Sequence, residues 1–197
     1  MRPSCERFVP GYGDANADFH VVGDHPGRHG GVDTGVPFTN ESGLDLQRAL
    51  ADAELLRSVG AEPGVRRTFL SYLHMCVPDG EGDPTESSYG DMERFFDAEL
   101  RAIAAHVLLP VGARATRYVL ENYTAQAHKT IVDMERLHAT ELRGSGFLVL
   151  PIRDPSEWAD DDHDDLVETL RNLRATDFRR EADLGRFLAG DDPYFVR

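Results

Sequence analysis

Four short apolar segments along the chain have the length and composition of buried β-strands. They cover residues 19–23, 68–76, 106–112 and 147–152. A continuous apolar run of this kind, bounded by residues that favour turns, is typical of a strand buried within a sheet. The pattern therefore predicts four buried strands.

Five other segments carry apolar residues at helical spacing. Residues 42–58 show it clearly, and Asn40 or Ser42 is available as the N-cap of this helix. The other predicted helices cover residues 92–105, 113–122, 164–174 and 180–188. Between two of these elements, residues 79–88 are rich in Gly, Pro, Asp and Ser and predict an exposed loop.

Strands and helices alternate along the chain, which indicates parallel strand pairing through right-handed crossovers. We therefore expect an α/β fold, a three-layer α/β/α sandwich with a central four-stranded parallel sheet, in a single domain over residues 1–197. In such sheets a ligand binds beyond the carboxyl ends of the strands. The residues of interest thus follow Val22, Leu73, Pro110 and Ile152.

Composition adds that the chain can bury one core, because it has 197 residues of which 41% are hydrophobic. It contains no apolar run of about 18 residues and no apolar stretch of the signal-peptide kind at its N-terminus. We expect a cytoplasmic monomer that does not contact a membrane.

The net charge of −14 would ordinarily argue against a nucleic-acid partner, because Lys and Arg drive phosphate binding. Lys129 is the single lysine, and Asp and Glu total 35, a composition that resembles proteins of salt-loving archaea. At molar salt the Debye length is about 3 Å, so most of the repulsion is screened. The sign of the charge therefore does not exclude DNA.

Two cysteines, Cys5 and Cys76, lie far apart in the sequence and are expected to be free thiols. Two groups have the residue types of a metal site: the acidic run 158–165, and His25 with His29 and Asp33. The acidic run is equally explained by the helix that begins near it, and the glycines between the histidines fix no ligand geometry. We predict no metal.

Several motifs resemble those of uracil-DNA glycosylases, particularly the iron–sulfur branch. Residues 23–27 (Gly-Asp-His-Pro-Gly) and 35–38 (Gly-Val-Pro-Phe), followed by Gly43, resemble the first motif of that family. Cys76-Val77-Pro78 stands where the family has Lys-Cys-Arg-Pro, and Asp154-Pro155-Ser156 stands where its second motif begins with His-Pro. The resemblance covers nearly the whole chain in order, and it implies a base-excision repair enzyme acting on DNA that carries a damaged base.

The resemblance assigns Asp24 to the sugar side of the reaction, where it positions a water or stabilises the positively charged sugar. Phe38 would stack on the flipped base, although an isolated Phe is more often a core residue. The loop residues Gly23, His25, Pro26 and Gly27 would hold the base or a phosphate, together with Pro155 and Ser156 of the second motif. Trp158 could either wedge into DNA or cap the core.

Two departures from the family affect the chemistry. The histidine that donates to the base is replaced by Asp154, which could substitute only if burial kept it protonated. The asparagine that reads uracil aligns with Tyr72, which lacks a paired donor and acceptor. Arg153 could provide a donor instead, and His25 could assist at the first motif. An iron–sulfur cluster needs four thiolates, so two cysteines predict no cofactor.

Three hypotheses remain. The first is a glycosylase that hydrolyses the N-glycosidic bond of uracil or another deaminated base. The second is a nucleotide- or nucleic-acid-binding protein of the same fold that has lost catalysis. The third is an unrelated hydrolase that uses the acidic run with a metal.

Overall fold

The computed structural model describes residues 3–78, 80, 82–124, 131–144, 146–180 and 182. Its sheet has the strand order β1-β3-β2-β4-β6-β5. The elements are β1 Tyr12–Gly13, β2 Phe19–Gly23, α1 Pro26–His29, α2 Glu41–Asp52, β3 Thr68–Tyr72, α3 Glu86–Ile103, β4 Val107–Pro110, α4 Gly112–Tyr123, α5 Met134–Leu137, β5 Leu142–Arg143, β6 Leu148–Val149, the 3-10 turn η1 Pro155–Glu157 and α6 Asp162–Arg174.

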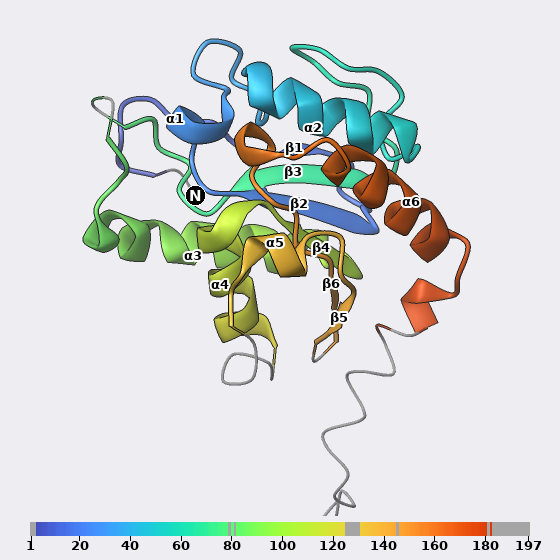
Figure 1. Cartoon of the computed structure of the whole chain (residues 1–197). Coiled ribbons are helices and arrows are strands. Elements are labelled where there is room, and N and C mark those ends of the chain that lie inside the picture. The colour runs from blue at the N-terminus through green and yellow to red at the C-terminus, as the bar shows by residue number, and fades with distance from the viewer. Residues whose placement is uncertain are drawn as a thin grey trace, which may run out of the picture.

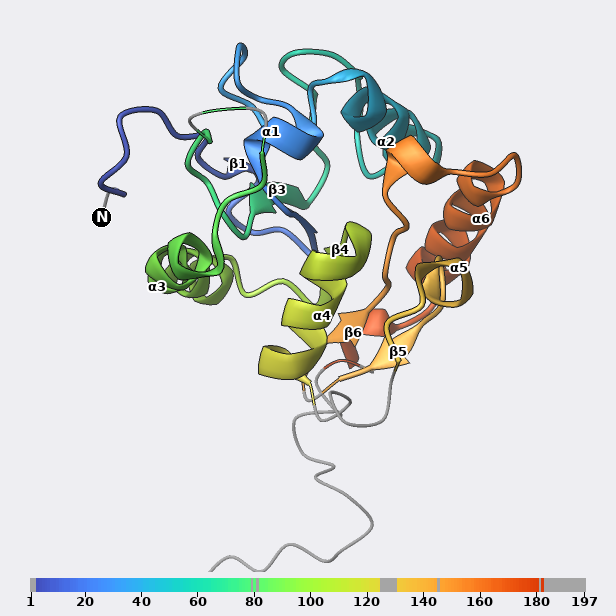
Figure 2. The same ribbon diagram turned by 60° about the vertical axis from the view of Figure 1, so that its left-hand side comes forward.

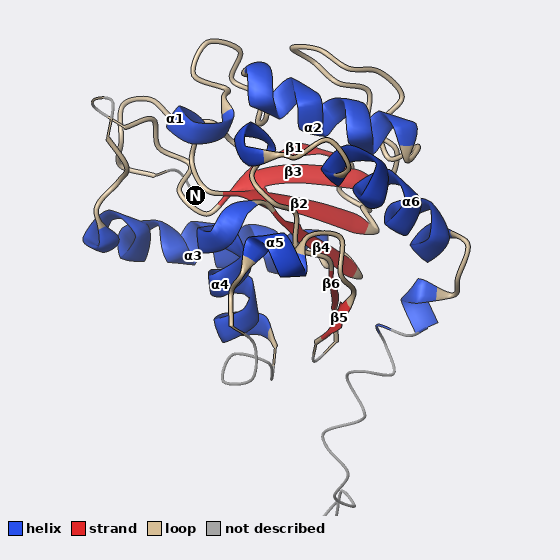
Figure 3. Ribbon diagram, viewed as in Figure 1, coloured by secondary structure: helices blue, strands red, loops and turns tan. Residues whose placement is uncertain are grey.

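The four predicted strands form the parallel centre of this sheet, in the order β3-β2-β4-β6. The short strands β1 and β5 add one antiparallel edge each, so the sheet has six strands rather than four. Helices cover both faces, with α1, α2 and α6 on one side and α3 and α4 on the other (Figures 1 and 2). The secondary-structure colouring in Figure 3 shows the same three layers. The predicted fold class is confirmed.

Alternation along the central strands explains why the sheet carries two apolar faces. In β4, Val107 and Leu109 join the core beneath α2 and α6, whereas Leu108 joins the core beneath α3 and α4. In β2, Val21 and Val22 divide in the same way. Successive side chains of a strand point to opposite faces, so both faces of a buried strand need apolar residues.

The helix boundaries differ from the sequence prediction in several places. α2 has Asn40 as its N-cap, whose side chain accepts a hydrogen bond from the Gly43 amide at 2.8 Å, but it ends at Asp52 rather than residue 58. α3 begins at Glu86, within the predicted loop, because the Thr85 side chain caps its first turn. The predicted strands 68–76 and 147–152 are shorter in the structure. The predicted helix 180–188 lies largely outside the described residues.

None of the helices in the described part of the chain has the length and apolar character that crossing a bilayer requires.

Cys5 and Cys76 form a disulfide, so the prediction of two free thiols is wrong. The N-terminal segment runs beside the residues that follow β3, where the Val9 amide donates to Met75 O at 2.8 Å and the Val77 amide donates to Arg7 O at 3.0 Å. This pairing brings two cysteines together although 71 positions separate them in the sequence. The spacing of the two cysteines in the sequence did not indicate that they form a disulfide.

Removing this disulfide should lower the free energy of unfolding by about 2–4 kcal/mol, because the cross-link closes a long loop in the unfolded chain. Urea unfolding of Cys5→Ser, and of the wild type with and without reductant, measures the effect. Adding reductant should not change the stability of Cys5→Ser. Equal stability of the wild type in both conditions would contradict the stabilising role of this bond.

Glu99 of α3 is a half-buried residue whose carboxyl group lies beside Ser71 of β3. Burial raises its pKa to about 7, although hydrogen bonds from Ser71 and the Gly11 backbone oppose the shift. The ordinary value is 4.5, so the unfolded chain loses this proton at lower pH than the folded chain does. Stability from this group is therefore full below pH 4.5 and is lost as the pH rises through 7.

Glu99→Gln removes this titration. The free energy of unfolding of the variant minus that of the wild type should therefore be about 2–3 kcal/mol larger at pH 8 than at pH 4.5. Denaturant unfolding at the two pH values measures the difference. Glu121→Gln, at an exposed position on α4, is the control and should show no such pH dependence. A constant difference between Glu99→Gln and the wild type at both pH values would refute the assignment.

Candidate active site

The carboxyl ends of the parallel strands bring together the residues that the motifs singled out. Asp24 directly follows β2, and Tyr72 is the last residue of β3. Asp154 lies beyond β6 and is the N-cap of η1. Gly112, which follows β4, is close to it, because a Cβ built on Gly112 would lie 3.9 Å from Asp154 Oδ2. This edge of the sheet is therefore the candidate active site.

Asp24 is a buried carboxylate held by groups from two helices. Its side chain is in contact with the Tyr89 hydroxyl of α3, which donates a hydrogen bond to Oδ1. Arg114 of α4 places its Nε 3.8 Å from Oδ2. Burial and the hydrogen bond to Asp24 raise the pKa of Tyr89, so this hydroxyl keeps its proton and remains a donor. The carboxylate is thus fixed in orientation and faces a cation.

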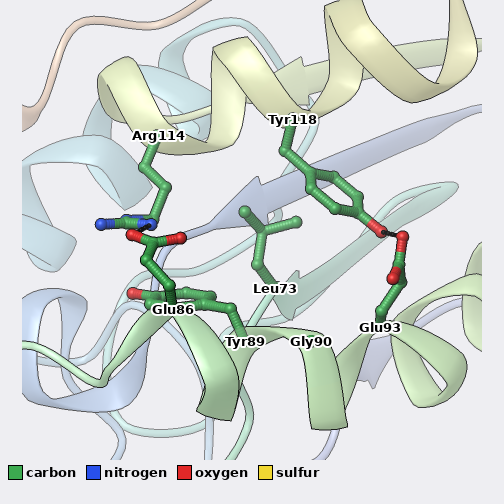
Figure 4. A pocket seen from close by; sticks show the side chains of 7 residues that line it. All are labelled: Leu73, Glu86, Tyr89, Gly90, Glu93, Arg114 and Tyr118. Atoms are coloured by element: carbon green, nitrogen blue, oxygen red, sulfur yellow. Dashed lines mark hydrogen bonds and ion pairs between the residues drawn. The ribbon is translucent and has the colours of Figure 1, made fainter.

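Tyr89 and Arg114 also line a pocket of about 200 Å³ between α3 and α4. The guanidinium of Arg114 lies over the Tyr89 ring, 4.3 Å from its centroid, and donates to Glu86 at 2.7 Å. Figure 4 shows these side chains converging from the two helices, with Leu73 at the back of the pocket. The two side chains that hold Asp24 therefore form part of the pocket wall.

Asp154 pairs with Arg28, the third residue of α1. The Arg28 Nε donates to Asp154 Oδ2 at 2.6 Å, and the Ser156 amide and hydroxyl donate to Oδ1 at 3.0 and 2.7 Å. Burial by itself raises the pKa of Asp154. The neighbouring His29 imidazole and the hydrogen bonds from Ser156 and Arg28 outweigh burial and lower the pKa below its ordinary value.

Asp154 is therefore ionised at neutral pH. Asp154 could replace a histidine donor only if it kept its proton, and the lowered pKa contradicts that condition. Arg28 balances the negative charge of Asp154. The Arg28 guanidinium is also close enough to Asp24 for the Asp24 carboxylate to raise the pKa of Arg28. Arg28 is thus the cation between the two acidic residues of the site.

Phe38 lies at the site but is covered by side chains of the protein itself. Its exposed fraction is 1%. Its ring centroid lies 5.3 Å from that of Tyr72 and 5.5 Å from that of His29. A Cβ built on Gly23 would be 2.7 Å from its Cζ, so the ring abuts the residue before Asp24. Phe38 thus lies beside Gly23 at the candidate site, and a base could reach its ring only after neighbouring side chains move.

The backbone of Phe38 is in the left-handed region, with φ 61°, which is uncommon for a bulky residue. Its amide donates to the Tyr72 hydroxyl at 2.7 Å, and its carbonyl accepts from Gln47 at 2.7 Å. Gly43 permits this close approach, because a Cβ there would lie 2.5 Å from the Phe38 carbonyl carbon. Several contacts thus hold a strained residue in place, as is common at functional sites.

Tyr72, which aligns with the base-reading asparagine, is committed to the loop rather than open to a base. Its hydroxyl donates to Gly30 O at 2.9 Å and accepts the Phe38 amide. It therefore joins the two ends of the loop that carries the first motif.

His25 is buried at the start of α1, where it is the N-cap residue. Its Nε2 lies 3.1 Å from Asp83 Oδ1. Pro26 is the first residue of α1, and Gly27 passes close to the His25 ring, since a Cβ on it would lie 3.1 Å from Nδ1. His25 is therefore buried at the first motif, and within the described part of the chain its Nδ1 has no hydrogen-bond partner.

The Arg153 side chain is held by acidic side chains of α5 and α6. Its Nη1 donates to Asp162 at 3.3 Å, and Nη2 lies 3.8 Å from Glu135. Trp158 donates from its indole to Arg153 O at 2.8 Å and packs against the core. These contacts engage the Arg153 guanidinium with two acidic side chains and favour a structural role for Trp158 over a wedge.

Pro155 is buried and Ser156 is exposed in η1, where Ser156 supports the Asp154 carboxylate. Within the residues described, no three His, Cys, Asp or Glu side chains are grouped as metal ligands. The residues present also do not fit an iron–sulfur cluster, because four thiolates are needed and both cysteines of the chain are joined in the disulfide.

Sequence reasoning missed Arg28, Tyr89 and Arg114. Arg28 lies inside the first motif, and a lone cation among glycines next to a carboxylate was a usable signal. Tyr89 and Arg114 are single residues in amphipathic helices, and no local pattern connects either of them to Asp24.

A family model described as the Uracil DNA glycosylase superfamily matches residues 10–174. A type-5 uracil-DNA glycosylase of Pyrobaculum aerophilum is 33% identical over 121 residues, which are 58% of this chain and 53% of that protein. A type-4 uracil-DNA glycosylase of Archaeoglobus fulgidus is 24% identical over 151 residues, 76% of this chain and 70% of that protein. A type-5 protein of Thermus thermophilus is 30% identical over 127 residues, 61% and 58% of the two chains. The matched part of this chain spans just over half the length of these type-5 relatives.

Proposed function

Because the chain belongs to the uracil-DNA glycosylase superfamily, we propose that it hydrolyses the N-glycosidic bond of uracil or another deaminated base in DNA. The observation that carries the proposal is the buried, oriented carboxylate of Asp24 at the carboxyl end of β2, with the cation of Arg28 near it. Breaking this bond leaves positive charge on the sugar and negative charge on the base. A fixed carboxylate and a fixed cation are suited to stabilise the two charges.

In this mechanism Asp24 faces the sugar. It stabilises the positive charge at C1′ and accepts a hydrogen bond from the water that attacks there. The electron pair of the broken bond leaves with the base, and the water oxygen forms the new bond to C1′. The proton that the water loses passes to the Asp24 carboxylate and from there, through solvent, to the departed base. Tyr89 and Arg114 hold the carboxylate in this orientation.

Arg28 would act on the side of the departing base. Its guanidinium is close to both Asp24 and Asp154. Asp154 then acts as a positioning residue, since its ionised carboxylate holds the guanidinium. The loop residues Gly23, His25, Pro26 and Gly27 would surround the sugar and phosphate. Phe38 would stack on the base once the aromatic cluster opens.

The protein would work without an iron–sulfur cluster and without a metal, as a cytoplasmic monomer on DNA. Its acidic composition indicates that it works in concentrated salt, where the repulsion between a chain of net charge −14 and DNA is screened.

The second candidate is a binding protein of the same fold that has lost catalysis. Two observations favour it: the ionised state of Asp154 and the coverage of Phe38 by Tyr72 and His29. Such a protein would hold nucleic acid without releasing a base.

One assay separates the candidates. The protein is incubated in molar KCl with single- and double-stranded oligonucleotides that carry uracil, hypoxanthine or xanthine, and the DNA is then heated in alkali. Strand breaks at the modified base, insensitive to chelator, support the glycosylase. Binding without breaks on any substrate supports the second candidate, and breaks abolished by chelator would favour a metal-dependent hydrolase.

A further inference from the structure

His29, the last residue of α1, is a fully buried histidine, and neither of its ring nitrogens has a hydrogen-bond partner among the described residues. It lies inside the candidate site, with its ring 5.5 Å from that of Phe38 and 6.3 Å from that of Tyr72, nearly parallel to the latter. It is also close enough to Asp154, Arg28 and His25 for their charges to act on it. The mechanism proposed above gives His29 no role.

Leaving both nitrogens unpaired is unfavourable, because a buried polar group without a partner has lost its hydrogen bonds to water. His20 provides the comparison within the chain. It is equally buried, in β2, but its Nε2 is bonded to Ser71 Oγ at 2.7 Å. Across the described residues, His29 is the one histidine with both ring nitrogens buried and unpaired. A phenylalanine would fill this aromatic cluster without that penalty.

Burial also lowers the pKa of His29 to about 4. The imidazole is therefore neutral at the pH of the cell, with one N–H and one lone pair. A neutral imidazole donates a hydrogen bond without carrying a buried charge, and its proton is present throughout the neutral range.

The departing base needs a donor at the carbonyl oxygen on which negative charge accumulates. Asp154, at the position where the resembled family has its histidine, is ionised and cannot donate. Arg28 is engaged by Asp154 and lies 3.7 Å from Glu157. The imidazole of His29 adds an N–H donor that no described group of the protein accepts, and it lies beside Phe38, on which the base would stack.

From this geometry we infer that His29 is the catalytic residue on the base side, donating its ring N–H to a carbonyl oxygen of the base that stacks on Phe38. The inference rests on the proposed function and names the group that replaces the missing histidine. It places the ligand of the aromatic cluster in one chemical class, a nucleobase that carries a carbonyl next to the glycosidic nitrogen.

The test compares His29→Phe, which keeps the aromatic packing and removes both nitrogens, with His29→Gln, which keeps an N–H donor. His20→Phe is the control for replacing an equally buried histidine outside the site. Single-turnover excision from a uracil oligonucleotide in molar KCl should fall by about 10²- to 10³-fold in His29→Phe. It should fall less in His29→Gln, and the melting temperature of His29→Phe should equal or exceed that of the wild type.

A second readout does not depend on turnover. The ¹⁵N chemical shifts of the His29 ring are recorded with an oligonucleotide that carries 2′-fluoro-2′-deoxyuridine, whose glycosidic bond resists hydrolysis, and with the matching oligonucleotide that carries deoxyadenosine, whose base has no carbonyl. A shift change with the uracil analogue alone supports the inference. Unchanged shifts, or excision by His29→Phe at the wild-type rate, would overturn it. If the wild type excises nothing, the proposed function fails, and the ¹⁵N shifts still decide whether His29 contacts the base.

Discussion

Asp24→Asn should lower the rate of base excision by about 10²- to 10⁴-fold, with little loss of stability. Asparagine has nearly the same shape as aspartate, and its side-chain oxygen can still accept the hydrogen bond from Tyr89. The negative charge that faces the sugar is lost, however, and so is the ion pair with Arg114. Single-turnover excision in molar KCl measures the rate, and thermal unfolding measures the stability.

Asp97→Asn is the matched control for this substitution. Asp97 also accepts a hydrogen bond from a tyrosine hydroxyl, that of Tyr123, but it lies on α3 away from the carboxyl ends of the strands. It should leave the excision rate unchanged. If Asp24→Asn kept the wild-type rate, a different carboxylate would have to serve the sugar, and the mechanism proposed above would be wrong.

The second large effect concerns Tyr72. Tyr72→Phe should lower the free energy of unfolding by about 2–5 kcal/mol, because it leaves the buried Phe38 amide and the Gly30 carbonyl without the tyrosine hydroxyl. For a chain of this size the melting temperature should fall by about 5–15 °C. Thermal and denaturant unfolding of the purified variant measure the loss.

Tyr12→Phe provides the comparison. Among the described residues the Tyr12 hydroxyl makes one hydrogen bond, to Pro63 O at 3.0 Å, and the residue is only partly buried. Its loss should be about 1 kcal/mol or less. Equal losses in the two variants would mean that the Tyr72 hydroxyl does not hold the first-motif loop closed.

Several features of the fold and the site could be predicted from local sequence. The four central strands are visible as apolar runs, because a strand buried on both faces needs apolar residues at every position. Asn40 could be recognised as an N-cap candidate, since capping involves only neighbouring residues. Asp24 and Phe38 could be placed at the carboxyl edge of the sheet, because each follows closely on the first buried strand.

Other features depended on residues that are distant in sequence. The pairing of Arg28 with Asp154 joins positions 126 residues apart, and the contact of Tyr89 with Asp24 joins positions 65 residues apart. The disulfide spans 71 positions. No local pattern marks such pairs, because the crossovers between parallel strands decide which loops meet.

The sequence by itself determined the layer architecture, and it predicted the edge of the sheet that we propose as the site, with a carboxylate and an aromatic ring there. Only the tertiary structure decided that Asp154 is ionised, that Phe38 is covered, and that the imidazole of His29 is neutral and unpaired. The reason is physical. The protonation state of a side chain and its access to a ligand depend on the charges, donors and packing around it in space, and these come from segments far apart in the chain.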